Sequence, residues 1–252
     1  MDDYGISVRL RSLLHPRSGR TLILALDAPL FAGPRGALND APGFIEELWS
    51  ECAGSVQAIL AHPGFHCHFV SPTIRFGRII NATGSTTLDD ERDKTQTTTV
   101  ANAIRLAADA IGIHLSLHHG NAPQMLSQAG RLVAEARSHS MPTLIASYVA
   151  GVDPIHRPDT VAHAAAVARD LGSSLVKVPF TGTVDSFRRV VDSARPARVV
   201  AAGGEAMTRD VALKTVEMVV EAGAAGICYG RTIFESHEPF KLITDLANLL
   251  HG

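Results

Sequence analysis

The sequence predicts a (β/α)8 barrel. Eight short apolar runs recur along the 252 residues, and most of them are followed by a segment with apolar side chains at helical spacing. Apolar runs without polar alternation are typical of parallel strands that are covered on both faces. Eight strand–helix alternations in about 250 residues fit a closed barrel, with an open doubly wound sheet as the alternative.

The expected strands and helices cover most of the chain. The strands are Thr21–Leu26, Val56–Leu60, Gly77–Ala82, Ala110–Leu115, Thr143–Tyr148, Ser174–Val178, Arg198–Ala202 and Ala225–Tyr229. The helices are Thr99–Ala108, Met125–Ser138, Thr160–Leu171, Thr183–Ala194, Asp210–Ala222 and His237–Leu250. Gly172 and Gly223 follow expected helix ends, where glycine commonly adopts the left-handed conformation. The region from Gly33 to Gly64 is the least defined by pattern.

Composition limits the classes of protein and partner. The chain has a net charge of -2, no cluster of basic residues, and no repeat or linker, so we expect one domain over residues 1–252 and no nucleic-acid partner. It lacks an apolar run of about 18 residues and the apolar core of a signal peptide, so we expect no membrane span. Three cysteines without paired spacing favour a reducing, cytoplasmic location.

Lys177 is the first candidate for chemistry because it interrupts an apolar strand, Leu175–Val178. Burial lowers the pKa of a lysine, and a neutral amine attacks carbonyl groups. A structural ion pair is the alternative. Only four of the 23 Lys and Arg residues are lysines, which favours a chemical role, since arginine cannot lose its proton to form an imine.

Two further polar residues lie where strands are expected to end. Asp27 follows the first strand and Tyr148 closes the fifth. In a barrel, the carboxyl ends of the strands carry the active site. Either side chain can exchange a proton with a substrate. The alternatives are a turn or cap at Asp27, before Pro29, and a core position for Tyr148.

Two short pairs that contain glycine follow the last two strands. They are Gly203-Gly204 and Gly230, the latter followed by Arg231. In this fold, backbone N–H groups after strands seven and eight commonly bind phosphate, and an arginine adds a charged contact. Two such pairs in successive turns favour a phosphate site over ordinary turns.

Histidine-rich segments raise the question of metal. His66-Cys67-His68 falls in an expected loop and has no third potential ligand at a suitable spacing. In an adjacent pair such as His118-His119, the second side chain usually points in a different direction from the first. Zinc sites take three or four protein ligands in a defined geometry. We therefore expect no metal and no other cofactor.

These residues resemble class I aldolases of the deoxyribose-phosphate aldolase superfamily, from about Val8 to the C-terminus. The similarity is greatest to archaeal-type fructose-bisphosphate aldolases and to 2-amino-3,7-dideoxy-D-threo-hept-6-ulosonate synthases. VKVPFTGTVDSF resembles the Schiff-base lysine motif, with Lys177 at the lysine position, and AAGG and YGRTIF resemble the two phosphate-binding turns. The resemblance maps the family's catalytic aspartate to Asp27. It also implies a homo-oligomer, commonly a decamer.

The chain departs from the family pattern at two places beside the expected site. The family usually reads Asp-His-Gly where this chain has Asp27-Ala28-Pro29, and Tyr-Pro-Arg-Gly where this chain has Tyr148-Val149-Ala150-Gly151. A histidine and an arginine are therefore replaced near the expected substrate. This predicts a changed substrate range.

The sequence thus predicts an aldolase or transaldolase that acts on a phosphorylated keto-sugar, with an aldehyde as a further substrate. Lys177 would form the imine, and Tyr148 and Asp27 would move protons. The iminium makes a metal unnecessary for this chemistry. The alternatives are a fructose-bisphosphate aldolase, a phosphosugar thiolase or isomerase, and a non-catalytic barrel that binds sugar phosphates.

Overall fold

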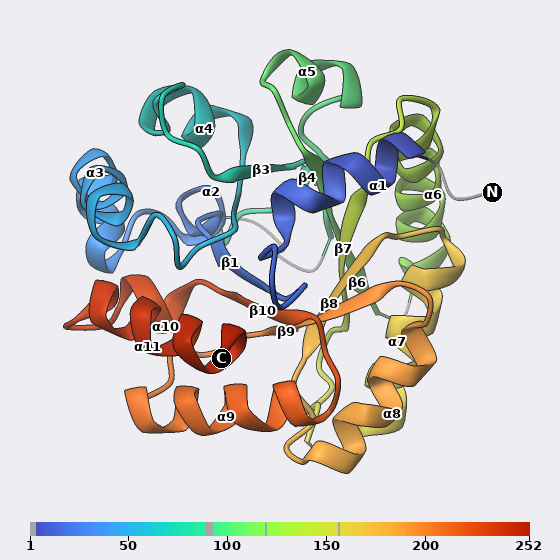
Figure 1. Cartoon of the computed structure of the whole chain (residues 1–252). Helices are drawn as coiled ribbons and strands as arrows, with labels where there is room; N and C mark the ends of the chain where they lie inside the picture. The colour runs from blue at the N-terminus through green and yellow to red at the C-terminus, as the bar shows by residue number, and fades with distance from the viewer. Residues whose placement is uncertain (1–3, 89–92, 119, 156) are drawn as a thin grey trace.

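Eight parallel strands close into a barrel with helices around its outside (Figure 1). The structure is a computed structural model that describes residues 4–88, 93–118, 120–155 and 157–252. The barrel strands are β1 (Thr21–Ala25), β2 (Ala58–Ala61), β3 (Gly77–Asn81), β6 (Ala110–Leu117), β7 (Thr143–Val149), β8 (Leu175–Pro179), β9 (Arg198–Ala202) and β10 (Gly226–Tyr229). Their order around the barrel is β1-β10-β9-β8-β7-β6-β3-β2. The predicted closed barrel is confirmed.

The helices cover the outer face and confirm the predicted periodicity. They are α1 (Tyr4–Leu10), α2 (Ala28–Ala32), α3 (Ala41–Cys52), α4 (Pro63–Phe69), α5 (Val100–Arg105), α6 (Ala122–Ser138), α7 (Pro158–Asp170), α8 (Val184–Ala194), α9 (Arg209–Glu221), α10 (Arg231–Phe234) and α11 (Pro239–His251). Gly172 and Gly223 have φ values of 96° and 83°, so each leaves its helix through the left-handed region as expected.

Two segments escaped the sequence patterns. The region from Gly33 to Gly64 contains a 3-10 turn (Gly36–Asp40), α3 and the start of α4, which were not predicted, and β2, which overlaps the expected strand Val56–Leu60. A short hairpin, β4 (Thr83–Gly84) with β5 (Thr95–Gln96), lies between β3 and α5. Among the described residues, no helix has both the length and the apolar character needed to cross a membrane.

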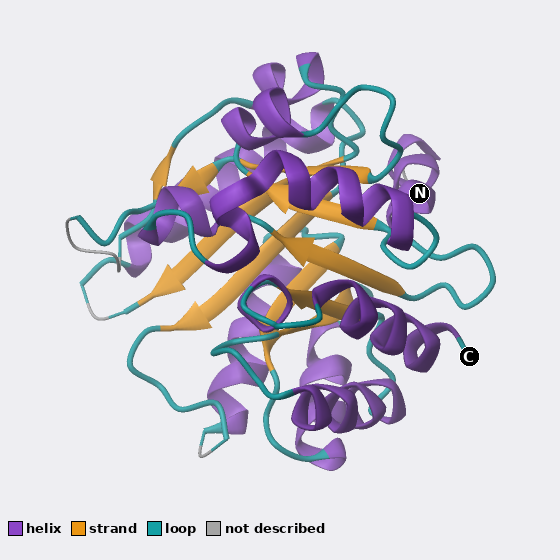
Figure 2. Ribbon diagram, turned by 90° about the vertical axis from the view of Figure 1, so that its left-hand side faces the viewer, coloured by secondary structure: helices purple, strands orange, loops and turns teal. Residues whose placement is uncertain are grey.

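The interior of the barrel is packed at one end and open at the other. Every barrel strand contributes one or two apolar side chains to an inner layer, and Leu13, from the segment before β1, packs into the same layer. The strands all point away from this closed end (Figure 2). Their carboxyl ends therefore surround the space left open.

Candidate active site

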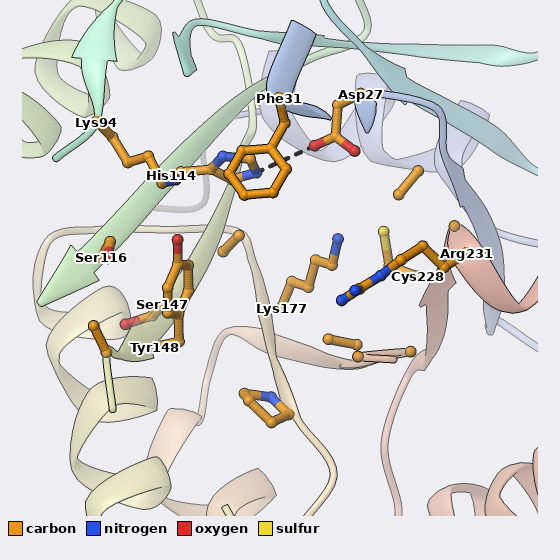
Figure 3. Close-up of a pocket in the computed structure, with 18 of the residues that line it drawn as sticks. Asp27, Phe31, Lys94, His114, Ser116, Ser147, Tyr148, Lys177, Cys228 and Arg231 are labelled. Carbon is orange, nitrogen blue, oxygen red and sulfur yellow. Dashed lines mark ion pairs between the residues drawn. The ribbon is translucent and has the colours of Figure 1, made fainter. Parts of the chain in front are cut away.

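A pocket of about 830 Å³ opens at the carboxyl ends of the strands (Figure 3). The pocket is lined by all seven residues predicted for the site: Asp27, Tyr148, Lys177, Gly203, Gly204, Gly230 and Arg231. These residues come from five different strands or the turns that follow them. The barrel thus brings together residues that are up to two hundred positions apart in the chain, as its topology requires.

Strand alternation places Lys177 inside the barrel. Leu175 belongs to the inner apolar layer, whereas Val176 and Val178 belong to the layer packed against the helices. Side chains alternate between the two faces of a strand, so Lys177 shares the inner face with Leu175. Its amino group extends into the pocket toward Asp27 and Cys228 (Figure 3).

Burial and the acidic neighbours of Lys177 shift its pKa in opposite directions. Burial lowers the pKa of Lys177, but Cys228 and Asp27 together raise it by more, and the result is above the ordinary lysine value. Burial raises the pKa of the Cys228 thiol, and the neighbouring Lys177 lowers it. Burial thus acts on Lys177 in the expected direction but is opposed by its acidic neighbours, and an ammonium at this position must lose a proton before it attacks a carbonyl.

Asp27 is held as a carboxylate by three neighbours. Burial would raise the pKa of Asp27, but the hydrogen bond from His114 and the charge of Lys177 hold it far below its usual range. His114 Nε2 and Asn81 Nδ2 both lie near Oδ2, at 3.3 Å and 2.9 Å. Asp27 occupies the N-cap position of α2, yet its side chain makes no capping hydrogen bond. Its side chain therefore contacts other residues of the pocket instead of capping the helix.

Tyr148 faces the pocket because its neighbour faces outward. The Ser147 hydroxyl donates a hydrogen bond to the carbonyl of Ala164 in α7, at 2.8 Å. By strand alternation, Ala146 and Tyr148 then point into the barrel, and both line the pocket. Tyr148 also interacts electrostatically with Lys177. The phenol is therefore within the reach of a group bound to Lys177.

Two adjacent turns form what we call the glycine side of the pocket, defined by Gly203, Gly204, Gly230 and Arg231. β9 and β10 are neighbours in the barrel, so the turns that follow them lie next to each other. Gly204 has a φ of 63°, and a Cβ at Gly230 would lie 2.6 Å from the Ala25 carbonyl oxygen. Both positions therefore require glycine. Arg231 Nη1 lies 2.9 Å from the Glu205 carboxylate.

The wall that runs from β1 through β3 to β6 is what we call the histidine side, defined by Asp27, Phe31, Asn81, Lys94 and His114. The Lys94 amino group donates to the Ser85 hydroxyl and lies 5.0 Å from the centre of the Phe31 ring. The sequence reasoning did not assign His114, Asn81 or Cys228 to the site. Side chains two positions apart on a strand share a face. Because Ile79 and Gly112 face the interior, the same alternation would have predicted that Asn81 and His114 do so too.

The histidine-rich segments have different surroundings from those expected. His66 is buried in helix α4, where a loop was predicted, and burial lowers its pKa to about 4. His118 contacts Asp93 at 2.9 Å, and His119 lies outside the described residues. Within the described part of the chain, no group of three or more His, Cys, Asp or Glu side chains is arranged to hold a metal ion.

Comparison with known proteins places this pocket in a family. The family model of DeoC/LacD aldolases matches residues 23–236. Over its full length the chain is 29% identical to 2-amino-3,7-dideoxy-D-threo-hept-6-ulosonate synthase from Halobacterium salinarum, covering 93% of that protein. It is 32% identical to 2-amino-4,5-dihydroxy-6-oxo-7-(phosphonooxy)heptanoate synthase from Streptomyces griseus, with 98% of this chain and 90% of that protein covered.

The fold comparison agrees. A Schiff-base-forming fructose-1,6-bisphosphate aldolase superposes with a TM-score of 0.88 at 26% identity, covering 97% of this chain and 99% of that one. The predicted resemblance and the predicted Schiff-base aldolase class are confirmed. The chain belongs to the DeoC/LacD family of aldolases.

Proposed function

We propose that the chain makes and breaks a carbon–carbon bond of a phosphorylated keto-sugar through an imine on Lys177. The observation that carries this proposal is the position of Lys177. Its amino group extends from the inner face of β8 into the pocket, between a fixed carboxylate and the glycine side. An iminium at the ketone carbon accepts the electron pair that the broken bond leaves behind.

Each residue of the site has a proposed role in this reaction. The glycine side binds the phosphate through backbone N–H groups of Gly203, Gly204 and Gly230 and through Arg231. Tyr148 exchanges the proton at the carbon next to the imine. Asp27 is a fixed negative charge, because a carboxyl group with so low a pKa is a poor proton carrier at neutral pH.

The substrate follows from the charges along the pocket. Position 150, on the pocket wall after β7, carries alanine and offers no charge to a second phosphate. Arg35 also lines the pocket, but it is drawn toward Glu235, at 3.8 Å. We therefore propose a singly phosphorylated ketose or ketone as the donor. Fructose 1,6-bisphosphate, the substrate of the structural neighbour by its name, is the alternative.

Borohydride trapping with a panel of keto-sugar phosphates tests this function. Borohydride reduces an imine to a stable amine, and mass spectrometry of the digested protein then locates the adduct. We expect an adduct on Lys177 with singly phosphorylated ketones. If no ketone phosphate gives an adduct under conditions where the chain binds the compound, the chain is an isomerase or a binding barrel, neither of which needs an imine.

The reaction needs no metal in this proposal, because the iminium supplies the electron sink. We expect the rate of ketose cleavage to be unchanged after prolonged dialysis against EDTA. Loss of activity with EDTA and its recovery with zinc would contradict the proposal.

We also propose a cytoplasmic homo-oligomer, by analogy with the family. The three cysteines are free, and two of them, Cys52 and Cys228, are buried. Light scattering at working concentration tests the assembly, and a mass of about 27 kDa, that of one 26.8 kDa chain, would contradict it.

A further inference from the structure

His114 belongs to the site, but it is not part of the sequence motifs and has no role in the proposed function. It lies on the inner face of β6, and 18% of its side chain is accessible, on the wall of the pocket. Its backbone N–H donates to the Thr83 hydroxyl at 2.7 Å, which fixes the strand at this point. The ring lies between Lys94 and Asp27 in Figure 3.

The ring nitrogens of His114 face different surroundings. Nε2 lies 3.3 Å from Asp27 Oδ2, and Asn81 fixes the same oxygen from the other side. Nδ1 has no hydrogen-bond partner within the described residues and is not buried, so it is open to the pocket. A carboxylate on one nitrogen orients an imidazole and stabilises its protonated form, which leaves the other nitrogen to exchange protons.

The barrel order places His114 on the far side of the pocket from Gly230 and Arg231, which follow β10. Counting around the closed sheet, β6 is four strands from β10 in either direction, so the two are directly opposite. β8, which carries Lys177, lies midway between them on one side of the barrel. A donor with its phosphate on the glycine side and its ketone carbon on Lys177 therefore extends its remaining carbons toward the histidine side.

We propose that His114 is the catalytic base that removes the proton from the hydroxyl group of the carbon beyond the bond being cleaved. The inference rests on the proposed function and adds a residue to it. The proton passes from the hydroxyl to the imidazole, and the oxygen electrons form the carbonyl of the departing aldehyde. The carbon–carbon pair moves into the iminium, which becomes a neutral enamine. The imidazolium is then balanced by Asp27, and condensation reverses each step.

Under this proposal two different residues carry out two proton transfers, and the overall cleavage rate alone does not distinguish them. Tyr148 exchanges the C–H proton of the donor, and His114 takes the proton of the hydroxyl group that becomes the carbonyl of the departing aldehyde. His114→Ala is therefore expected to cleave ketose phosphates about 10²- to 10⁴-fold more slowly, which is the usual contribution of a general base. The same variant is expected to form the borohydride adduct with dihydroxyacetone phosphate and to exchange its C–H proton in D2O within about threefold of wild type, because neither step needs this base.

Added imidazole distinguishes a catalytic role from a structural one. We expect it to restore cleavage to His114→Ala in a concentration-dependent manner, since the space left by the ring is open to the pocket. His118→Gln is the matched control, because His118 follows the same strand, contacts Asp93 and is not among the residues that line the pocket. Normal cleavage by that variant is expected.

Three results would overturn the inference. Cleavage by His114→Ala within fivefold of wild type would show that the base is elsewhere. A parallel loss of adduct formation and C–H exchange would show that His114 only maintains the site. Absence of adduct and exchange in the wild-type enzyme would instead overturn the proposed function, and this inference with it. If His114→Ala does not fold, His114→Gln, which keeps a donor toward Asp27, is subject to the same criteria.

Discussion

The two sides of the pocket are built differently. The glycine side comes from two consecutive strand–turn units, and the residues that define it fall within residues 203–231. The histidine side is assembled from residues 27–114, which lie within β3 and β6 or in the segments that follow β1 and β4, and it is held together by side-chain contacts. The glycine side matches the family motifs, whereas replacements at Ala28-Pro29 and Val149-Ala150 lie on or beside the other walls.

This difference suggests how the family varies its reactions. Backbone N–H groups bind phosphate without specifying the rest of a substrate, so the glycine side can stay constant while substrates change. In the proposed function, side chains on the histidine side would meet the second substrate and select it. The chain has Lys177 at the expected imine position and differs from the family pattern at Ala28-Pro29 and Val149-Ala150. Four experiments test this division.

The largest effect is expected from Lys177→Arg. Arginine keeps the charge and approximate length but cannot form an imine, so turnover should fall by roughly 10⁴-fold or more, as when a covalent nucleophile is removed. Lys94→Arg is the matched control, because Lys94 is also buried and also lines the pocket. Adduct mapping by mass spectrometry should find Lys177 modified in the Lys94 variant. An adduct on Lys94 in the wild-type enzyme would reverse the roles of the two sides.

Arg231→Ala tests the glycine side. Loss of a charge-assisted hydrogen bond costs about 1.5–3 kcal/mol, which corresponds to a roughly 10- to 100-fold rise in KM for a singly phosphorylated donor. The rate of cleavage at saturation should change little. Glu205→Gln removes the carboxylate that Arg231 contacts at 2.9 Å, and it should lower KM slightly. An unchanged KM in both variants would place the phosphate elsewhere.

Ala150→Arg tests the part of the pocket wall that follows β7, where we expect about a tenfold change in preference. The new guanidinium adds donors and a positive charge at the pocket wall. The ratio of kcat/KM for fructose 1,6-bisphosphate to that for a singly phosphorylated ketose should rise. If the bisphosphate is already the best substrate of the wild-type enzyme by a wide margin, the replacement at position 150 is neutral. An unchanged ratio in the variant would show that this residue does not meet the substrate.

The smallest effect is expected on the free energy of unfolding at low pH, through the buried side chain of His66. Burial, with a contribution from Arg78, lowers the pKa of His66 to about 4, whereas an unfolded histidine titrates near pH 6.5. The unfolded chain therefore binds more protons between these values, and the free energy of unfolding decreases as the pH falls from about 6.5 to about 4. The contribution of His66 is about 3 kcal/mol at the lower end.

His66→Leu should make the unfolding midpoint less sensitive to pH over this window, as measured by urea denaturation at several pH values. His68→Leu is the control, because His68 lies on the same helix and is exposed. Hydrogen exchange at pH 5 should show faster exchange in β2 and α4 than in β8 and β9. Equal acid sensitivity in the His66 variant and in wild type would show that other groups dominate.

The sequence alone determined the fold and the part of the site that lies in consecutive units. Eight apolar runs, most of them followed by a helical segment, were enough to predict the barrel. Apolar runs without polar alternation are typical of parallel strands that are covered on both faces. Lys177, Gly203, Gly204, Gly230 and Arg231 each stand at or directly after a strand, so their common location follows from the barrel itself. Asp27 and Tyr148 were found in the same way.

Only the tertiary structure decided which side chains meet. Asn81 and His114 reach Asp27 because β3, β6 and β1 place their inner faces around one cavity, and these contacts span many residues of sequence. The protonation of Lys177 was also beyond the sequence. Burial and a nearby carboxylate shift its pKa in opposite directions, and their balance depends on the position of Asp27 in space. The sequence pattern indicates which residues face inward. The charged groups that lie near each of them depend on how the barrel closes.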